Sequence, residues 1–233
     1  MSRSRFESTV WLTIWKASDN DPNALDDFVK RYRPPIEKFI LQNGFGTADA
    51  EELSQEVFLR IFKNNVLKKA RKERGRFRSL LLTLTRHVIQ DERRRRGAAK
   101  RGGDHITVSP QHTSEEGLPL EELVASHTED RQFDHFWVSN ILKLSLEKLR
   151  VENESYYTAF TMNLDDYDYK AIAERMGKSP KEVDNYVYRA KQKLIRLIRD
   201  EIASYASSPQ EYRDEITYLS TYLPKTGDRE RSK

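Results

Sequence analysis

The chain has 233 residues, 37% of them hydrophobic, with a formal net charge of +4 and no cysteine. It can therefore form neither a disulfide nor a thiolate-bound zinc site, and its five histidines lack a metal-binding spacing, so we expect no cofactor. No stretch reaches the ~18 apolar residues of a membrane span, and residues 1–20 are too polar for a secretory signal. We expect a soluble cytoplasmic protein.

The charges are segregated along the chain. Residues 71–101 hold twelve Lys/Arg against three Asp/Glu, whereas residues 104–134 hold one Arg against eight Asp/Glu. A basic block followed by an acidic block indicates an anion-binding surface and then a segment that avoids or mimics anions.

Two helices are predicted before the basic block. Residues 23–43 have a helical pattern that Pro34 and Pro35 should kink or interrupt, and Gly44 and Gly46 end it. Thr47 or Asp49 can then cap the helix DAEELSQEVFLRIF. Its buried face is expected to hold Leu53, Val57, Phe58, Ile61 and Phe62, with Glu52, Glu56, Arg60 and Lys63 opposite.

The basic block contains the stretch GRFRSLLLTLTRHVIQDERRRR, residues 75–96. At about 100° per residue, one apolar stripe forms from Phe77, Leu80, Leu81, Leu84 and Val88. The other side holds Ser79, Thr83, Arg86, Gln90 and Arg93, with His87 and Arg94 beside it. This pattern predicts an amphipathic helix with a basic outer face. The plain alternative is a solvated surface helix whose arginines only keep the chain soluble.

After this helix the composition changes. Residues 98–132 are rich in Gly, Ser, Thr and Glu and predict a flexible acidic linker. Helical pattern resumes over residues 133–150 and continues in ESYYTAFTMNL. The tail, residues 205–233, is polar and is either disordered or a short helix; we favour disorder. The prediction is an all-α chain with two small modules, residues 21–97 and 133–204.

The second module carries a helix-turn-helix pattern. Asp168 can cap a first helix, and Gly177 stands where a helix ends in the left-handed conformation. Ser179, Pro180 and Glu182 form a capping box for the next helix. That helix should bury Val183, Val187, Ala190 and Leu194 and expose Lys181, Asn185, Arg189, Gln192 and Arg196. An ordinary helical hairpin is the alternative, but amides and guanidinium groups at this spacing favour DNA binding.

These motifs resemble a known family. The stretch DAEELSQEVFLRIF is similar to the Asp-Ala-Glu-Asp-Leu-x-Gln-Glu-Val-Phe signature of bacterial sigma factors, and the basic helix is similar to their promoter-melting helix. With only these two modules, the chain resembles the extracytoplasmic-function (ECF) group of the sigma-70 family. The resemblance covers most of residues 20–200. It implies a non-enzymatic subunit whose partners are core RNA polymerase and promoter DNA.

The resemblance also implies roles for single residues. The basic helix should hold the separated −10 element through Arg78, Thr83, Arg86, His87, Gln90, Arg93, Arg94, Arg95 and Arg96. His87 stands where relatives often carry an asparagine that captures a flipped base. Alternatively, His87 only packs at the edge of the apolar stripe, beside Leu84 and Val88.

Polymerase contact is implied for Glu52, Leu53, Gln55 and Glu56. Leu53 is also a candidate core residue, and the two glutamates could belong to a solvated face. The −35 element would be recognised by Lys181, Asn185, Tyr186, Arg189, Gln192 and Arg196. Residues 183–186 read Val-Asp-Asn-Tyr where many relatives have Val-Lys-Ser-Arg, so the preferred −35 sequence stays open, as does binding by an anti-sigma protein.

Two other functions fit the sequence less well. A stand-alone helix-turn-helix regulator would explain residues 160–200 but leave DAEELSQEVFLRIF and the basic helix without a role. A metal-dependent nuclease would need an acidic cluster with ligand spacing, which the sequence does not show.

Overall fold

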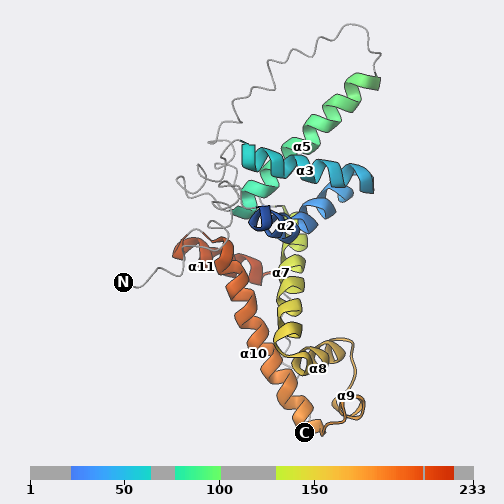
Figure 1. Ribbon diagram of the computed structural model, residues 1–233, viewed down its shortest axis with the longest axis vertical. Coiled ribbons are helices and arrows are strands. Elements are labelled where there is room, and N and C mark those ends of the chain that lie inside the picture. The colour runs from blue at the N-terminus through green and yellow to red at the C-terminus, as the bar shows by residue number, and fades with distance from the viewer. Residues whose placement is uncertain (1–21, 64–76, 101–129, 207, 223–233) are drawn as a thin grey trace. The chain divides into compact units, whose positions relative to one another are not determined.

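The computed structural model describes residues 22–63, 77–100, 130–206 and 208–222, and all regular structure in these ranges is helical (Figure 1). The helices are α2 (Pro22–Gln42), α3 (Thr47–Lys63), α5 (Phe77–Lys100), α7 (Arg131–Glu152), α8 (Glu154–Leu164), α9 (Tyr169–Met176), α10 (Pro180–Tyr205) and α11 (Pro209–Ser220). The all-α prediction is confirmed over this part of the chain. The predicted linker falls mostly outside the described residues. None of these helices is both long and apolar enough to cross a membrane.

The described residues form two compact units. Unit 1 comprises those within Met1–Trp137 and Tyr205–Lys233, and unit 2 comprises Val138–Ser204. Their bounds differ from the two predicted modules at the start of α7 and at the C-terminal tail. Local pattern placed the start of α7 in the second module and residues 205–233 in a separate tail. Contacts place the described residues of both segments in unit 1.

The core of unit 1 is built where α2, α3 and α5 pack on one another. Every residue of the apolar stripe predicted for α5 is buried, as are Leu53, Val57, Phe58 and Ile61 of α3. Leu82, Thr85 and Ile89 are buried too, so α5 is enclosed over more of its circumference than one stripe. At its first turn an aromatic cluster joins Tyr32, Phe77, Trp137 and Tyr205 with ring centroids 5.0–6.1 Å apart.

The connection from α2 to α3 follows from local chemistry. The helix α2 continues through Pro34 and Pro35, so the predicted interruption is wrong, whereas the alternative prediction of a kink stays open. It ends at Gln42, and Gly44 just beyond it has a φ of +90°, which favours glycine. Neither Thr47 nor Asp49 is the N-cap residue of α3. Gly46 takes that place, since Ala50 N–H donates to its carbonyl (2.9 Å), and Asp49 accepts a hydrogen bond from the Gly46 N–H (3.3 Å).

The C-terminal tail contains a helix rather than the favoured disorder. The Ser208 side chain caps α11 by accepting a hydrogen bond from the Glu211 N–H (3.1 Å), and Pro209 occupies the first turn. Residues 208–211 read Ser-Pro-Gln-Glu, the same Ser-Pro-x-Glu pattern that starts α10 at residues 179–182. This helix-start signal was present in the sequence and was missed.

Unit 2 contains two neighbouring apolar clusters. One gathers Leu149, Phe160, Ala190, Leu194 and Leu197, and the other gathers Ala159, Ile172, Ala173, Val183 and Val187. Each joins α10 to preceding helices, which holds the outer face of α10 toward solvent. Burial of Val183, Val187, Ala190 and Leu194 was predicted from their spacing and is confirmed.

The predicted caps of unit 2 are confirmed. Asp168 accepts a hydrogen bond from the Ala171 N–H (2.8 Å), and Glu182 accepts one from the Ser179 N–H (2.8 Å). Gly177 has φ +62° and its N–H donates to the Glu174 carbonyl (3.3 Å), so α9 ends in the left-handed conformation. These local bonds fix the turn between α9 and α10.

We expect Gly177→Ala to lower the free energy of unfolding by about 1 kcal/mol, because a Cβ in the left-handed conformation is strained. Urea denaturation monitored by circular dichroism measures the change. Lys178→Ala, an exposed neighbour outside that conformation, is the control. Equal midpoints for the two variants would contradict the role given to this glycine.

Candidate nucleic-acid interface

The residues expected to bind DNA along α5 divide into a buried group and an exposed group. Arg78 and Thr83 are buried, Arg86 and His87 are half-buried, and the exposed residues are Gln90, Arg93, Arg94, Arg95 and Arg96. The basic face predicted along the whole helix is therefore open only over its C-terminal half.

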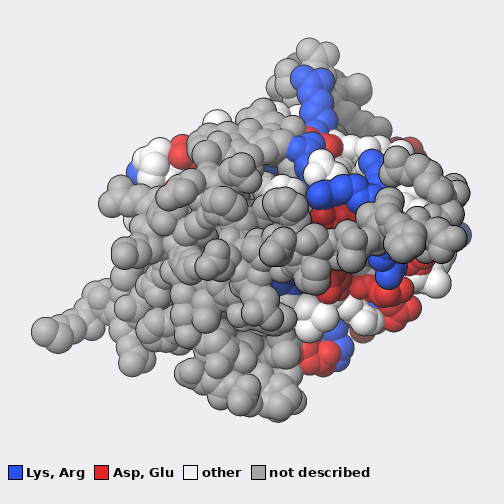
Figure 2. Space-filling view, turned by 90° about the horizontal axis from the view of Figure 1, so that it is seen from above, with Lys and Arg blue, Asp and Glu red and all other residues white. Residues whose placement is uncertain are grey.

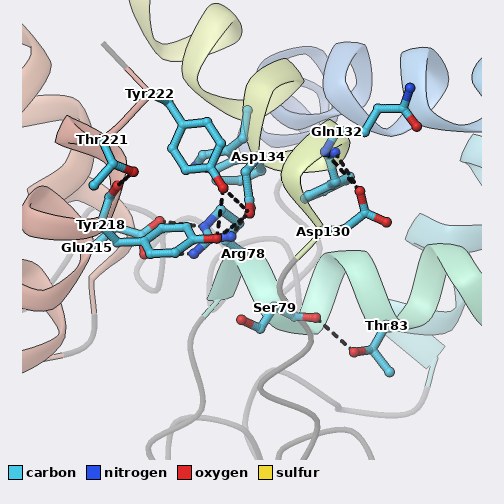
Figure 3. A network of polar contacts seen from close by, with 12 residues as sticks. Arg78, Ser79, Thr83, Asp130, Gln132, Asp134, Glu215, Tyr218, Thr221 and Tyr222 are labelled. Atoms are coloured by element: carbon cyan, nitrogen blue, oxygen red, sulfur yellow. Dashed lines mark hydrogen bonds and ion pairs between the residues drawn. The ribbon is translucent and has the colours of Figure 1, made fainter. Parts of the chain in front are cut away.

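Arg78 is enclosed by its own chain (Figure 3). Its guanidinium donates to the Asp134 carboxylate and, from Nε, to Glu215 Oε1 at 2.8 Å, and it lies 4.6 Å from the centroid of the Tyr218 ring. Its side chain is 1% exposed. Burial lowers the pKa of this guanidinium, but the two carboxylates raise it more, and it stays charged. The resemblance implied that Arg78 contacts the −10 element, but the structure buries its side chain.

Asp134, on α7, offsets the positive charge of the Arg78 guanidinium. Burial raises the pKa of this carboxyl, although the Arg78 charge and hydrogen bonds from two tyrosines act in the opposite direction. Tyr218 donates a hydrogen bond to Asp134 Oδ2 at 2.6 Å and Tyr222 donates another at 3.3 Å. The hydroxyls thus share the excess negative charge left by two carboxylates around one guanidinium.

Two further residues of this half-helix contact their own unit. Thr83 donates to the Ser79 carbonyl at 2.9 Å, a bond that lets a hydroxyl be buried on a helix. Arg86 donates to Asp130 Oδ2 at 2.7 Å, while Asp130 Oδ1 accepts from the Gln132 and Phe133 N–H groups. Asp130 therefore caps α7 and neutralises Arg86 at the same time.

The exposed arginines of α5 are paired with nearby carboxylates. Arg94 contacts Asp91 (2.7 Å), Arg95 contacts Glu92 (2.7 Å), and Arg96 contacts both Glu92 and Asp49 (2.6 Å each). Hydrogen bonds from Arg95, with those from Arg96, lower the pKa of Glu92. Figure 2 shows basic and acidic residues intermingled on the described part of that face.

These pairs do not remove the basic surface. The side chains of Arg94 and Arg95 are 75% and 71% exposed, and exposed ion pairs contribute at most about 1 kcal/mol. A phosphate can therefore replace the carboxylate at small cost. Arg93 differs, because within the described part of the chain its guanidinium donates to the Asn43 carbonyl (2.8 Å) rather than to a carboxylate.

The helix α3 presents a second exposed face. Glu52 and Gln55 are exposed, Glu56 is half-buried, and Leu53 is 7% exposed, so Leu53 belongs to the core. Leu59 is 61% exposed and follows Gln55 by four residues, which places it on the same face. Leu59 is not among the residues predicted from the sequence, although its spacing from Glu52, Gln55 and Glu56 is helical. Glu56 also accepts a 2.7 Å hydrogen bond from Arg60, which itself contacts Asp91 of α5.

In unit 2, the outer face of α10 holds most of the expected −35 residues. Lys181, Asn185, Arg189, Gln192 and Arg196 are exposed and Tyr186 is half-buried. Arg189 donates to the Tyr156 hydroxyl at 3.3 Å, and Arg196 lies 3.9 Å from Asp200 with its side chain 78% exposed. Tyr186 packs near Tyr156, with ring centroids 5.4 Å apart. The face thus offers amide and guanidinium donors with few competing acids.

Among the described residues, no group of three or more His, Cys, Asp or Glu is placed to hold a metal ion. The arrangement is that of two binding surfaces, one basic and one of mixed amide and guanidinium groups, on separate helical units.

Both surfaces lie largely within stretches of the chain that match known protein families. The family model for sigma-70 region 2 matches residues 28–99, which run from α2 to the end of α5. The model for sigma-70 region 4, of the type typical of ECF factors, matches residues 153–194, from just before α8 into α10. The curated proteins and solved structures compared with the chain contain no match.

The two regions occur in family order, and each lies within a helical unit that has an exposed polar face. The chain belongs to the sigma-70 family and is an RNA polymerase sigma factor.

Proposed function

We propose that this sigma factor holds the −10 element on the exposed half of α5. Gln90 and Arg93–Arg96 would contact the DNA, with His87 at the edge of that surface. Arg86 could join by exchanging Asp130 for a phosphate. Arg78 and Thr83 are left out of this set, because both are buried.

Core polymerase would bind the exposed face of α3. Glu52, Gln55 and Leu59 form the accessible part of this surface, and Leu59 supplies the apolar centre that a protein interface needs. Glu56 would lie at its edge.

The −35 element would be read by α10. The capping box at Ser179 fixes where the helix begins, and its outer face carries donors suited to base edges and phosphates. Tyr186, on the same helix, would add an aromatic contact.

The observation that carries the function is the match of region 2 and region 4 in one chain. The test is gel filtration of the purified chain with core polymerase, followed by run-off transcription on genomic fragments. A sigma factor co-elutes and starts transcripts at defined sites. A stand-alone regulator would bind DNA without co-eluting.

We expect Leu59→Asp to weaken core polymerase binding by about tenfold or more, since loss of a buried leucine costs about 1.5–3 kcal/mol. Fluorescence titration with core polymerase measures the affinity. Leu41→Asp is the matched control, because Leu41 is a 41% exposed leucine on α2. Equal affinities of the two variants would remove Leu59 from the interface.

We expect Arg189→Ala and Arg196→Ala to weaken binding to −35 duplex while leaving polymerase binding intact. A lost phosphate contact should reduce the salt slope by about 0.9, whereas a lost base contact costs about 1–3 kcal/mol at one position. Band-shift titrations at several salt concentrations distinguish these. Lys143→Ala, an exposed cation on α7, is the control; unchanged affinity for both arginine variants means that α10 is not the reader.

We expect His87→Ala to impair open-complex formation more than initial promoter binding, because stacking on a separated base is worth about 1–3 kcal/mol. Arg94→Ala with Arg95→Ala should do the reverse, in a salt-dependent way. Permanganate footprinting on duplex and pre-melted templates checks both. Rescue of His87→Ala by pre-melting supports base capture, and an equal defect on both templates, or none, rejects it.

A further inference from the structure

The helix α11 lies beyond both matched regions, which end at residues 99 and 194. It nevertheless reaches the first turn of α5, the helix assigned to the −10 element. Glu215 accepts hydrogen bonds from Arg78 at Nε (2.8 Å) and Nη2 (3.4 Å), so it grips the guanidinium with both oxygens. This is the strongest common form of a carboxylate–guanidinium contact.

A second carboxylate of α11 reaches the backbone of α5. Glu211 Oε1 accepts a hydrogen bond from the Phe77 N–H at 3.3 Å, and Glu211 is buried. The first N–H groups of a helix have no partner within it, and they carry partial positive charge. The Glu211 carboxylate therefore satisfies one of these groups and fixes where α5 begins.

The contacts are part of a packed core. Tyr205 donates a hydrogen bond to Glu215 at 3.1 Å and accepts one from the Trp137 indole at 3.3 Å, and both rings belong to the aromatic cluster around Phe77. Glu215 and Leu219 are 1% and 3% exposed. A loosely held helix would leave these groups partly solvated, whereas here they are buried, and Figure 3 shows Glu215 and Tyr218 of α11 directed at Arg78.

We propose that Glu211 and Glu215 are positioning residues for promoter opening: from the C-terminal helix, they fix the start and the rotation of α5, so that its exposed half meets the −10 strand. Arg78 acts with them as the positioning partner on α5. The inference rests on the proposed role of α5 at the −10 element.

The test compares two neutral variants of adjacent acids in the full-length protein. Glu215→Gln removes the charge that faces Arg78, and Asp214→Asn removes the charge of a neighbouring acid that accepts a hydrogen bond from Gln210, one turn earlier on α11 (2.8 Å). Each is assayed for thermal unfolding, core polymerase binding, and open-complex formation on duplex and pre-melted promoter. All functional assays are run where the unfolding curve shows the variant folded.

We expect Glu215→Gln to unfold at lower temperature and to open duplex promoter about tenfold more slowly, since small misplacements of a functional group carry costs of this order or larger. Its polymerase affinity should stay within about twofold of the wild type, because Glu215 accepts its hydrogen bonds from Arg78 and Tyr205, which lie outside α3. Asp214→Asn should behave like the wild type. A loss of stability alone would not change the ratio of opening to polymerase binding at a temperature where the protein is folded.

If Glu215→Gln does not fold, a milder variant and a set of compensating variants test the same proposal. Tyr205→Phe removes only the hydroxyl that donates to Glu215 and should give the same defect in weaker form. Arg78→Met leaves Glu215 and Asp134 buried without their cation, and adding Glu215→Gln with Asp134→Asn should restore part of the opening rate. No rescue, or a gain of promoter binding in Glu215→Gln, would show that Arg78 contacts DNA and that α11 inhibits it.

These experiments distinguish failure of the proposed function from failure of the roles given to Glu211 and Glu215. If the wild-type chain neither binds core polymerase nor opens a promoter, the proposed function is overturned and the inference falls with it. If the wild type opens promoters and Glu215→Gln opens them equally fast, only the inference is overturned.

Discussion

Unit 1 depends on the burial of one guanidinium. Arginine cannot lose its proton in a protein, so a 1% exposed Arg78 requires carboxylates within contact distance. The chain supplies them from Asp134 and Glu215, which lie 56 and 137 residues further along. Meeting this requirement brings the first turn of α7 and the whole of α11 to the start of α5. A segment that looks like a polar tail in the sequence thereby becomes part of unit 1.

The same contacts decide which part of α5 is available to DNA. Asp130, Asp134 and Glu215 engage Arg86 and Arg78 on the N-terminal half, whereas the C-terminal half carries exposed arginines in weak surface pairs. The charge excess counted over residues 71–101 therefore overstates the field that a promoter meets, since part of it is neutralised within unit 1. In the proposed −10 contact, a phosphate would replace the carboxylates that pair with Arg94–Arg96, and such an exchange of anions favours a strongly salt-dependent and readily reversible contact.

Features set by residues close together in the sequence could be predicted from it, whereas features set by distant residues could not. Helix caps act within four residues, so Asp168, Gly177 and Ser179 could be assigned from local pattern. The Ser-Pro-x-Glu start of α11 was equally local and was passed over because the tail is polar overall. Apolar periodicity located the cores of α3 and α5, but it treated Thr83 as outward-facing. A hydroxyl that bonds the carbonyl four residues earlier can be buried, and periodicity does not register this. The surroundings of Arg78 could not be predicted, because nothing local marks an arginine for partners more than fifty residues away.

The central claim, that α11 and the start of α5 form one cooperative structure, can be measured by hydrogen exchange on the full-length protein. The account predicts that the amides of α11 and of the first turns of α5 are protected to the same degree. In Glu215→Gln both sets should lose protection together, while amides of α9 and α10 in unit 2 keep theirs. Rapid exchange throughout α11 beside a fully protected α5 would contradict the claim.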